Sequence, residues 1–553
     1  MSSCKMKVIA FIAAFLTVFS ATACFGGSEN SAGGSTGDSY ESGESESLSA
    51  SENRFESDSE SGSGDTGDME EKLDFKNILA KQSFSLNAGE KKTINVARNI
   101  GAANYLKLTV ESEVNLEGYF DYANTETDER KREEFFIEKN SETPFYQLID
   151  WYSRVGEPTR DNEDSYYMIP ETWYERKEYD KRIDSISFTN KSDKTAEIKV
   201  VSLEVAEREM VLSKTVYLEN DYIKAGINLG WGGGIGFLTR MDKNVQQVVI
   251  GNENAIGVNY AKKEGAKLVA DRVNLINQST AGRSAQVSLY GKNVDDETYS
   301  RGIYRTTKKE WPYNPVQCGD QWDTHSEVVD YKIGKDEIYV KTRPRDWATC
   351  VSTKSYTECR YSISGKVVKA ENRYFDWTGL THDKYDENGE LVPNKRNQEV
   401  PALSAVVPLN TMVLYEGDDP WTGKNLTYLK DLGYWSVASG QAGKYLSTTI
   451  ARESWAAWVN ADDFGLGLYV PDIEKAVAGR HLNYNLSFTG LADAQIQFNY
   501  LTFLGVFALE TYEPLSYEFY LTADNVTQMR RTFKALNDSG ECKNDDIKKW
   551  QMK

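Results

Sequence analysis

The stretch KKEWPYNPVQCGDQWDTHSEVVDY (residues 308–331) collects aromatic rings, amides and carboxylates around two prolines, which is typical of a loop rather than a strand. Sugars present hydroxyl edges and apolar C–H faces. Aromatic platforms with amide and carboxylate acceptors match both. We therefore expect a carbohydrate site, with Asp320 as a catalytic carboxylate and these substrate-binding residues: Trp311, Tyr313, Asn314, Gln317 and Trp322. The alternative is a buried loop whose amides satisfy its own backbone.

A second stretch, residues 373–403, ends with Glu399 immediately before an apolar strand. A carboxylate at a sheet rim lies near apolar walls that raise its pKa, which suits a general acid or base. We therefore expect Asp320 and Glu399 to act as paired carboxylates in glycoside chemistry, with His382 as an auxiliary. For His382 the alternative is an ordinary surface histidine.

Two shorter stretches supply further candidates. YEGDDPWTGKNL (415–426) places Trp421 in an acidic turn. Such a turn could hold calcium through oxygen ligands, but a solvated turn is favoured because the spacing matches no known calcium loop. VAGRHLNYN (477–485) offers Arg480 as a clamp for an anionic sugar. Trp421 and Arg480 are therefore also substrate-binding candidates.

Glycines dominate the stretch INLGWGGGIGFL (227–238), which lies between two strand-like runs. The longer segment LENDYIKAGINLGWGGGIGFL resembles the entry hairpin of the galactose-mutarotase-like β-supersandwich. Glycine is needed where a large sheet curls and a neighbouring backbone approaches, so we expect a structural role. Trp231 is either a core plug or an exposed substrate platform. In the family, a histidine and a carboxylate act on the concave sheet, and His382 and Glu399 supply these residue types.

Short alternating runs separated by Gly, Asn and Asp indicate an all-β fold. Residues 75–208 are expected to form a β-sandwich, in which ARNIGAANYLKLTVESEVNLEGYFDY (97–122) resembles jelly-roll ancillary domains of secreted carbohydrate-active proteins. Residues 211–545 are expected to form a large β-supersandwich. Its one convincing helix is predicted over 526–536.

The N-terminus has the layout of an export signal over residues 1–23, with Lys5 and Lys7 before an apolar run. Ala21-Thr22-Ala23 before Cys24 resembles a bacterial lipobox, although the family usually has leucine where Ala21 stands. Cys24 would then carry lipid and anchor the protein to the outer face of the cell membrane. Ordinary signal cleavage is the alternative.

Residues 24–72 are rich in Ser, Glu and Gly and predict a disordered tether. The tail from 28 to 72 has a net charge of −11, and residues 73–553 another −11. No basic stripe is present, so nucleic acid is an unsuitable partner. No C-x-x-C motif occurs and the 3 histidines are scattered, so we expect neither zinc nor another cofactor. A disulfide between Cys350 and Cys359 and unpaired thiols both remain open.

Together these features predict a monomeric cell-surface lipoprotein that binds and processes glycan. A non-catalytic glycan-binding lipoprotein and a structural envelope lipoprotein with protein partners are the alternatives. The second of these gives no reason for the tryptophans in the loops.

A Cys24→Ala substitution tests the anchor. We expect the variant to move from the membrane fraction into the medium, because no lipid can be attached. An unchanged distribution in membrane fractionation would show that the lipoprotein hypothesis is wrong.

Overall fold

The computed structural model describes residues 73–149, 153–154, 174–175, 179–208, 215–241, 249–250, 262–264, 267–269, 274–277, 284–291, 303–304, 309–321, 324–380, 384–385, 391–392, 396–406, 409–430, 432, 434–435, 447–481, 498–507 and 509–545. Gly67–Lys553 form one compact unit. The predicted all-β fold is confirmed, since the described residues form strands with a single α-helix. None of their helices is long and apolar enough to cross a membrane.

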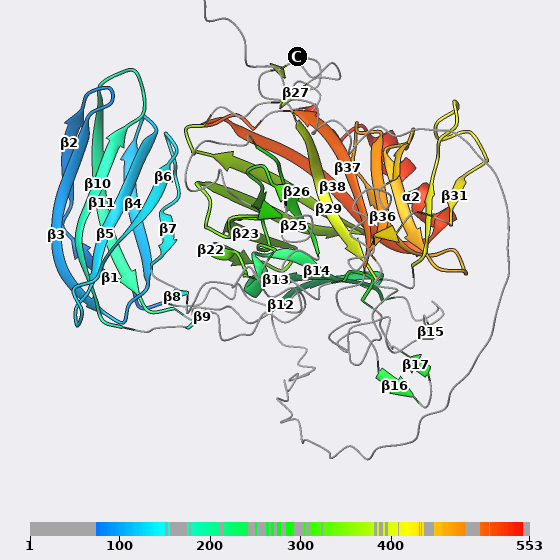
Figure 1. Ribbon diagram of the computed structural model, residues 1–553, viewed down its shortest axis with the longest axis horizontal. Coiled ribbons are helices and arrows are strands. Elements are labelled where there is room, and N and C mark those ends of the chain that lie inside the picture. Colours follow the sequence, from blue (N-terminus) through cyan, green and yellow to red (C-terminus); the bar gives the residue numbers. More distant parts are fainter. Residues whose placement is uncertain are drawn as a thin grey trace, which may run out of the picture. The chain divides into compact units, whose positions relative to one another are not determined.

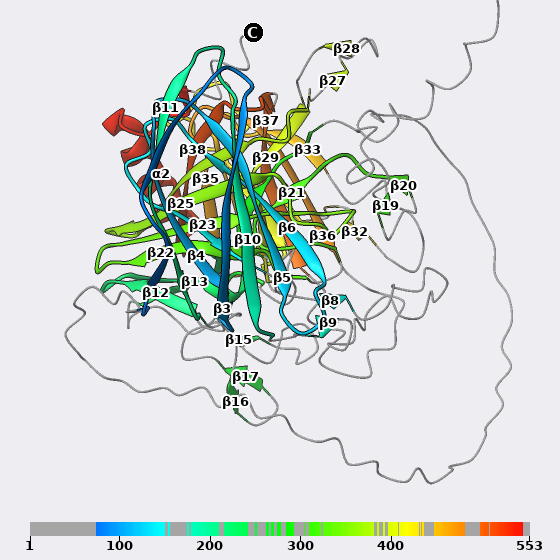
Figure 2. The same ribbon diagram turned by 90° about the vertical axis from the view of Figure 1, so that its left-hand side faces the viewer.

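Two antiparallel sheets come first in the chain (blue to cyan in Figure 1). The 5-stranded sheet runs β1 (Lys76–Leu79), β11 (Ala196–Ala206), β4 (Tyr105–Ser112), β7 (Phe145–Leu148), with β2 (Gln82–Leu86) also on β11. The 4-stranded sheet runs β3 (Lys91–Gly101), β10 (Lys181–Asn190), β5 (Leu116–Asn124), β6 (Arg130–Ile137), side by side in Figure 2. Alternating apolar residues of both sheets, including Leu108 and Phe120, share one core, as in a β-sandwich.

Two large sheets follow the sandwich in the chain, and the first of them has 11 strands. Its main path is β12 (Thr215–Glu219), β13 (Ile223–Asn228), β14 (Gly234–Arg240), β18 (Ala285–Ser288), β29 (Arg396–Ala405), β37 (Phe498–Phe507), β36 (Lys475–His481), β32 (Tyr434–Trp435). Off this path lie β21 (Pro315–Val316), β24 (Arg345–Asp346) and β33 (Ser447–Ile450).

The second large sheet has 9 strands. Its order is β22 (Glu327–Ile333), β23 (Glu337–Arg343), β25 (Ser355–Ser364), β26 (Val367–Asp376), β38 (Pro514–Asn525), β35 (Phe464–Tyr469), β34 (Trp455–Val459), β30 (Thr411–Leu414), β31 (Thr427–Leu429). Side chains of both large sheets, such as Leu501 and Phe519, meet in one apolar core. Two sheets facing each other across a common core form the expected β-supersandwich.

Shorter elements complete the described chain. Small sheets are formed by β15 (Val249–Ile250), β17 (Lys267–Val269) and β16 (Lys262–Glu264); by β19 (Ile303–Tyr304) and β20 (Lys309–Glu310); by β27 (Lys384–Tyr385) and β28 (Leu391–Val392); and by β8 (Ser153–Arg154) and β9 (Tyr174–Glu175). A 3₁₀ turn, η3, spans Leu229–Trp231.

Helix α2 (Val526–Ser539) begins and ends with standard caps. The Asn525 side chain accepts from the Gln528 N–H, and Gly540 closes the helix with φ of 69°. Its apolar face, with Met529 and Phe533, packs against Trp455 and other residues of the 9-stranded sheet. The helix starts where the sequence predicts and runs three residues further.

The sandwich and the 9-stranded sheet share contacts. Val329 and Phe375 of the 9-stranded sheet, and Trp377 just after β26, join the hydrophobic core of the sandwich. The Tyr105 hydroxyl donates to the Val329 carbonyl oxygen over 2.8 Å. The sequence boundary at residues 208–211 stays a prediction, because the whole segment behaves as one compact unit.

In the described chain Cys318, Cys350, Cys359 and Cys542 form no disulfide bond. Cys359 is fully buried in β25, whereas Cys350 lies in the preceding loop at the surface of the core. The structure therefore contains no disulfide between Cys350 and Cys359.

The glycine turn after β13 serves close packing. A Cβ on Gly232 would collide with the Gln317 carbonyl oxygen, and one on Gly233 with the Val340 side chain. Both glycines also have positive φ, 58° and 68°. The turn therefore passes directly beneath neighbouring strands, where only glycine fits.

Two alanine substitutions, one at Gly233 and one at Gly365 in the turn between β25 and β26, separate backbone strain from overpacking. Gly365 also has positive φ, 55°, but open space around its Cα. Gly365→Ala should lower the free energy of unfolding by about 1 kcal/mol through backbone strain alone. Gly233→Ala should cost roughly 3 kcal/mol, since overpacking adds to the strain. Urea denaturation of both variants measures the difference, and equal losses would contradict a packing role for Gly233.

Candidate functional site

The two faces of the 11-stranded sheet differ in chemistry. Along the segment that begins with β18, Val287 and Leu289 enter the shared core, whereas Ser288 and Tyr290 alternate with them. Successive side chains of a strand point to opposite faces. Ser288 and Tyr290 therefore lie on the face turned away from the core, which we call the outer face.

The neighbouring strands continue this outer face. On β29, Val400 enters the core, so Glu399 points the other way, and its backbone pairs with that of Ser288. On β37, Leu501 enters the core and Tyr500 points outward. Three adjacent strands thus bring one carboxylate and three hydroxyl groups together.

Glu399 is the centre of this group. Glu399 as a whole residue is partly exposed, whereas its carboxyl group is enclosed, and this burial raises the pKa of the carboxyl group. Hydrogen bonds from Tyr500, Ser288 and Tyr290 act in the opposite direction, because they stabilise the charged form. No cation within the described part of the chain contributes to this pKa. Among the described residues, neutral hydroxyl donors alone therefore favour the charged form of this carboxyl group.

Gln398 fixes the backbone beside the carboxylate. Its side-chain carbonyl oxygen accepts from the Tyr290 N–H at 2.6 Å, and its amide donates to the Tyr290 carbonyl at 2.8 Å. The same amide donates to the Phe507 carbonyl at 3.1 Å on the other side. This fully buried side chain thus joins both strands that flank Glu399. Beyond the Ser288–Glu399 backbone pair, the Gln398 side chain thus holds the two chain segments together by hydrogen bonds.

Two predicted binding residues reach the same group. The Trp311 indole N–H donates to the Asn314 side-chain oxygen at 3.2 Å. The Asn314 amide donates to the Leu289 carbonyl at 2.6 Å and lies 3.4 Å from the Ser288 hydroxyl. The ring of Trp311 meets that of Tyr290 edge-on, with centroids 6.2 Å apart. The structure therefore brings Trp311, Asn314 and Glu399 close together, while their roles as site residues stay predictions. Asn314 is buried, with its amide bound to the Leu289 carbonyl. We call the group of Ser288, Tyr290, Trp311, Glu399 and Tyr500 the Glu399 site.

Asp320 is placed elsewhere, in a buried ion pair. Its side chain is inaccessible to solvent, and its carboxylate accepts from Arg345 Nε at 2.8 Å and from the Thr324 N–H at 3.0 Å. No carboxylate of the described residues affects the pKa of Glu399. The prediction that Asp320 and Glu399 act as paired carboxylates is therefore wrong. Asp320 is buried and its charge is compensated by Arg345.

Tyr313 and Gln317 are also interior residues. Tyr313 is fully buried in the core of the large sheets, and its hydroxyl lies 3.4 Å from an Asp376 carboxylate oxygen. The Gln317 amide donates to the Gly232 carbonyl at 3.0 Å and to the Tyr361 hydroxyl at 3.1 Å. For these two residues the alternative of a self-satisfied buried loop describes the structure, so neither presents a surface to a sugar.

The aromatic candidates Trp231 and Trp421 pack against other rings. Trp231 is half-buried with its ring 4.6 Å from that of His325, whose pKa burial lowers to about 4. Trp421 meets Tyr469 edge-on at 6.3 Å, beside the cluster that holds α2. Neither belongs to the Glu399 site.

Arg480 lies on the opposite side of the sheet from Tyr500. Its backbone pairs with that of Asn499, and its Nε donates to the Asn499 side-chain oxygen at 3.3 Å. Asn499 and Tyr500 are neighbours on β37 and face opposite sides of the sheet, and Arg480 lies on the side of Asn499. Arg480 is therefore not on the outer face. His382, Trp322 and Cys24 lie outside the described residues, so their predicted roles stay predictions.

The sequence analysis missed Ser288, Tyr290 and Tyr500. A usable signal was present, since AQVSLY (285–290) alternates apolar and polar residues in the manner of a strand with one exposed face. The shared site depends on pairing between strands more than 100 residues apart, which alternation alone does not reveal. Among described residues no group of three His, Cys, Asp or Glu side chains could hold a metal.

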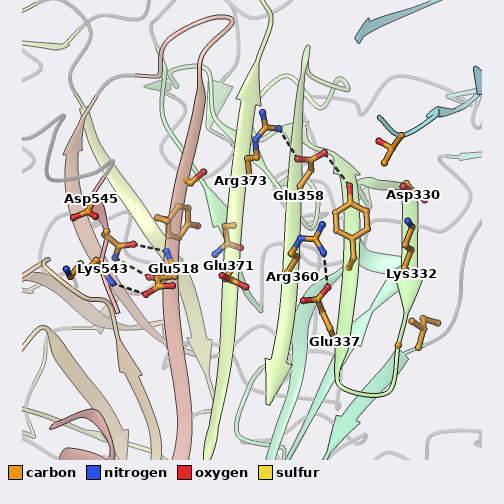
Figure 3. A pocket seen from close by; sticks show the side chains of 18 residues that line it. Asp330, Lys332, Glu337, Glu358, Arg360, Glu371, Arg373, Glu518, Lys543 and Asp545 are labelled. Atoms are coloured by element: carbon orange, nitrogen blue, oxygen red, sulfur yellow. Dashed lines mark hydrogen bonds and ion pairs between the residues drawn. The ribbon is translucent and has the colours of Figure 1, made fainter. Parts of the chain in front are cut away.

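A groove of about 1020 Å³ on the 9-stranded sheet is a second candidate (Figure 3). It is bounded by Thr143 of the sandwich and by Lys543–Asp545 near the C-terminus. Its floor carries charged residues of both signs: Asp330, Lys332, Glu337, Glu358, Arg360, Glu371, Arg373 and Glu518.

Ion pairs already engage both arginines of this groove. Arg360 lies 2.8 Å from Glu337, and Arg373 lies 2.9 Å from Glu358. Ligand pockets are usually lined by apolar and aromatic side chains with a few unpaired polar groups. The charged floor of the groove does not fit this description.

The pH dependence of stability tests the state of Glu399. Burial raises its pKa in the folded protein above the unfolded value of about 4.3. Between these pKa values the folded state binds more protons, so stability falls as pH rises. Wild type should therefore lose stability relative to Glu399→Gln from about pH 4.3 up to the raised pKa.

Urea unfolding at several pH values measures this difference. Glu327 and Asp346, whose pKa values burial raises to about 7 and about 6, are present in both proteins and cancel. A pH-independent difference between the two proteins would contradict the raised pKa.

This chain resembles known proteins only in structure, and at low sequence identity. No family model matches the sequence. None of the curated proteins matches it either. Similar solved structures include a galactose mutarotase related enzyme from Lactobacillus acidophilus, with 10% identity, a TM-score of 0.30, and coverage of 56% of this chain and 98% of that one.

Two further structures span a similar part of the chain. A galactose mutarotase-like protein from Lactobacillus casei ATCC 334 has 11% identity and a TM-score of 0.31, covering 56% of this chain and 100% of that one. A 4-alpha-glucanotransferase from Thermococcus litoralis has 12% identity and a TM-score of 0.25, covering 56% and 37%. Likenesses this low carry no argument about activity, and the fold assignment rests on the sheets themselves.

Proposed function

We propose that this protein binds carbohydrate at the Glu399 site and that Glu399 exchanges a proton with the bound sugar. The observation that carries the proposal is a carboxyl group with a raised pKa, surrounded by hydroxyl groups, on an outer sheet face beside an aromatic pair. Hydroxyl groups and a carboxylate suit sugar hydroxyls, and aromatic rings suit the C–H faces of the sugar.

The chemistry of the step follows from the surroundings of Glu399. A carboxyl group kept neutral by burial donates a proton to a sugar oxygen. In the charged form, which Tyr500, Ser288 and Tyr290 stabilise, it accepts a proton from a sugar hydroxyl. The step uses a single carboxyl group, since Asp320 is held by Arg345.

We further propose that this activity is displayed at the cell surface. The export signal and Cys24 support a lipid anchor, and the acidic stretch from 28 to 72 supports an extended spacer between the membrane and the sheets. Such a protein would meet glycans outside the cell.

Glycan binding by the full chain with Cys24→Ala tests the proposal. Glu399→Gln keeps the size of the side chain but cannot exchange a proton, so turnover should be lost while affinity is retained. Trp311→Ala should weaken affinity about tenfold, roughly the loss of one aromatic contact. A glycan array followed by calorimetry and product analysis provides both readouts.

Glu513→Gln is the matched control, since Glu513 is an exposed carboxylate in the turn before β38. It should change neither affinity nor turnover. Normal binding by Trp311→Ala would contradict the position of the site. Binding without turnover by wild type would leave a glycan-binding protein with no catalytic step.

A further inference from the structure

The groove on the 9-stranded sheet is large and lies apart from the Glu399 site (Figure 3). Its volume of about 1020 Å³ is at the upper end of the roughly 300–1,000 Å³ that ligand pockets usually span. Its lining residues, from Thr143 to Asp545, all belong to the described part of the chain. None of them is a residue of the Glu399 site. The groove therefore has room for a ligand larger than a single sugar ring.

One aromatic ring lies in the polar floor of this groove. Tyr339 on β23 is half-buried, and its hydroxyl donates to the Glu358 carboxylate at 3.3 Å. The Arg360 guanidinium lies over the ring, 5.0 Å from its centroid. Lys332 on β22 and Arg360 on β25 are the direct cross-strand neighbours of Tyr339. Side chains that face each other across strands lie on the same side of a sheet. The floor thus combines an apolar ring with donors and acceptors of hydrogen bonds on either side of it.

The charged side chains around Tyr339 are held in ion pairs and yet reach the solvent. Arg360 lies 2.8 Å from Glu337, and their side chains are 55% and 47% exposed. Glu371, also 47% exposed, lies 2.9 Å from Lys369. A guanidinium has more N–H groups, and a carboxylate more lone pairs, than one ion pair uses. Because the pairs already restrict these side chains, a ligand that binds to them loses less side-chain entropy.

The pairing of these charges determines which ligand chemistry the groove suits. A charged ligand would have to displace a partner that is already present, Glu337 from Arg360 or Glu358 from Arg373. A hydroxyl group donates to a paired carboxylate and accepts from a paired guanidinium without breaking the pair. An apolar ligand would remove water from these groups and replace none of its hydrogen bonds, which is costly. A ligand with many hydroxyl groups and no net charge therefore suits the groove.

We propose that the groove on the 9-stranded sheet is a second carbohydrate-binding site, which takes a neutral oligosaccharide. The sugar hydroxyl groups hydrogen-bond to Arg360 and Glu371, and sugar C–H groups lie against Tyr339. This site is independent of the Glu399 site, since it lies on the other large sheet and shares no residue with it. It goes beyond the proposed function, because it holds a glycan at a place where no proton is exchanged.

Two arginine substitutions test the groove on the full chain that carries Cys24→Ala and Trp311→Ala, which weakens the Glu399 site. Arg360→Met keeps an unbranched side chain but removes every N–H donor. Affinity for a neutral oligosaccharide should fall about tenfold, the loss of a hydrogen bond to a charged group. Arg452→Met is the matched control and should leave the affinity unchanged, because Arg452 lies 3.0 Å from Glu474 in an equally exposed pair outside the groove. Exposed ion pairs contribute little to stability, so both variants should fold, which circular dichroism checks.

Calorimetry with three classes of probe defines the ligand. The neutral probes are oligosaccharides of glucose, galactose, mannose and xylose. An oligogalacturonate is the anionic probe, and a glucosamine oligomer is the cationic one. A neutral oligosaccharide should bind most tightly. Its affinity should change by about twofold at most between about 0.05 and about 0.5 M NaCl, because salt screens only the attraction between charges.

The outcomes separate the groove from the Glu399 site. Weaker binding by Arg360→Met but not by Arg452→Met supports the groove. Equal binding by both variants, or loss of all glycan binding through Trp311→Ala alone, overturns the groove and leaves the Glu399 site intact. Preference for a charged probe, or an affinity that falls steeply with salt, overturns the neutral class of ligand. Absence of binding to every glycan, also by the chain that retains Trp311, overturns both proposals.

Discussion

The common core between the 11-stranded and 9-stranded sheets constrains the rest of the structure. Apolar residues at every second position must meet across that core, so each strand has only one face left for other uses. The position of Val400 in the core places Glu399 outside it, and that of Leu501 does the same for Tyr500. Packing at the inner face therefore decides which side chains lie on the outer face.

Local patterns predicted the elements of this fold well. Alternation of apolar and polar residues indicated the strands, and the helix predicted over 526–536 begins at the first residue of α2. The glycine run before β14 was assigned to close packing from residue type alone, and the contacts of Gly232 and Gly233 agree with that assignment.

The candidate site was only partly predictable, for a physical reason. Residue types suggest sugar chemistry, but burial decides which of them reach a ligand. Asp320 and Gln317 carry suitable groups, yet an arginine and a backbone carbonyl occupy them. Strand pairing places Glu399 on the outer face beside Ser288, and the segment before β21 brings the Trp311 ring to Tyr290. That pairing joins residues distant in the chain and leaves no local trace.

The charged floor of the groove on the 9-stranded sheet has a consequence for strand alignment during folding. In the native register Glu358 faces Arg373, and Arg360 faces Glu371. A shift of β26 by two residues in one direction would set Glu358 against Glu371 and Arg360 against Lys369. The opposite shift would set Arg360 against Arg373. Like charges directly opposite each other destabilise a strand pair. The order of charges along β25 and β26 therefore destabilises hairpins that are out of register by two residues. This selection does not depend on apolar packing in the core.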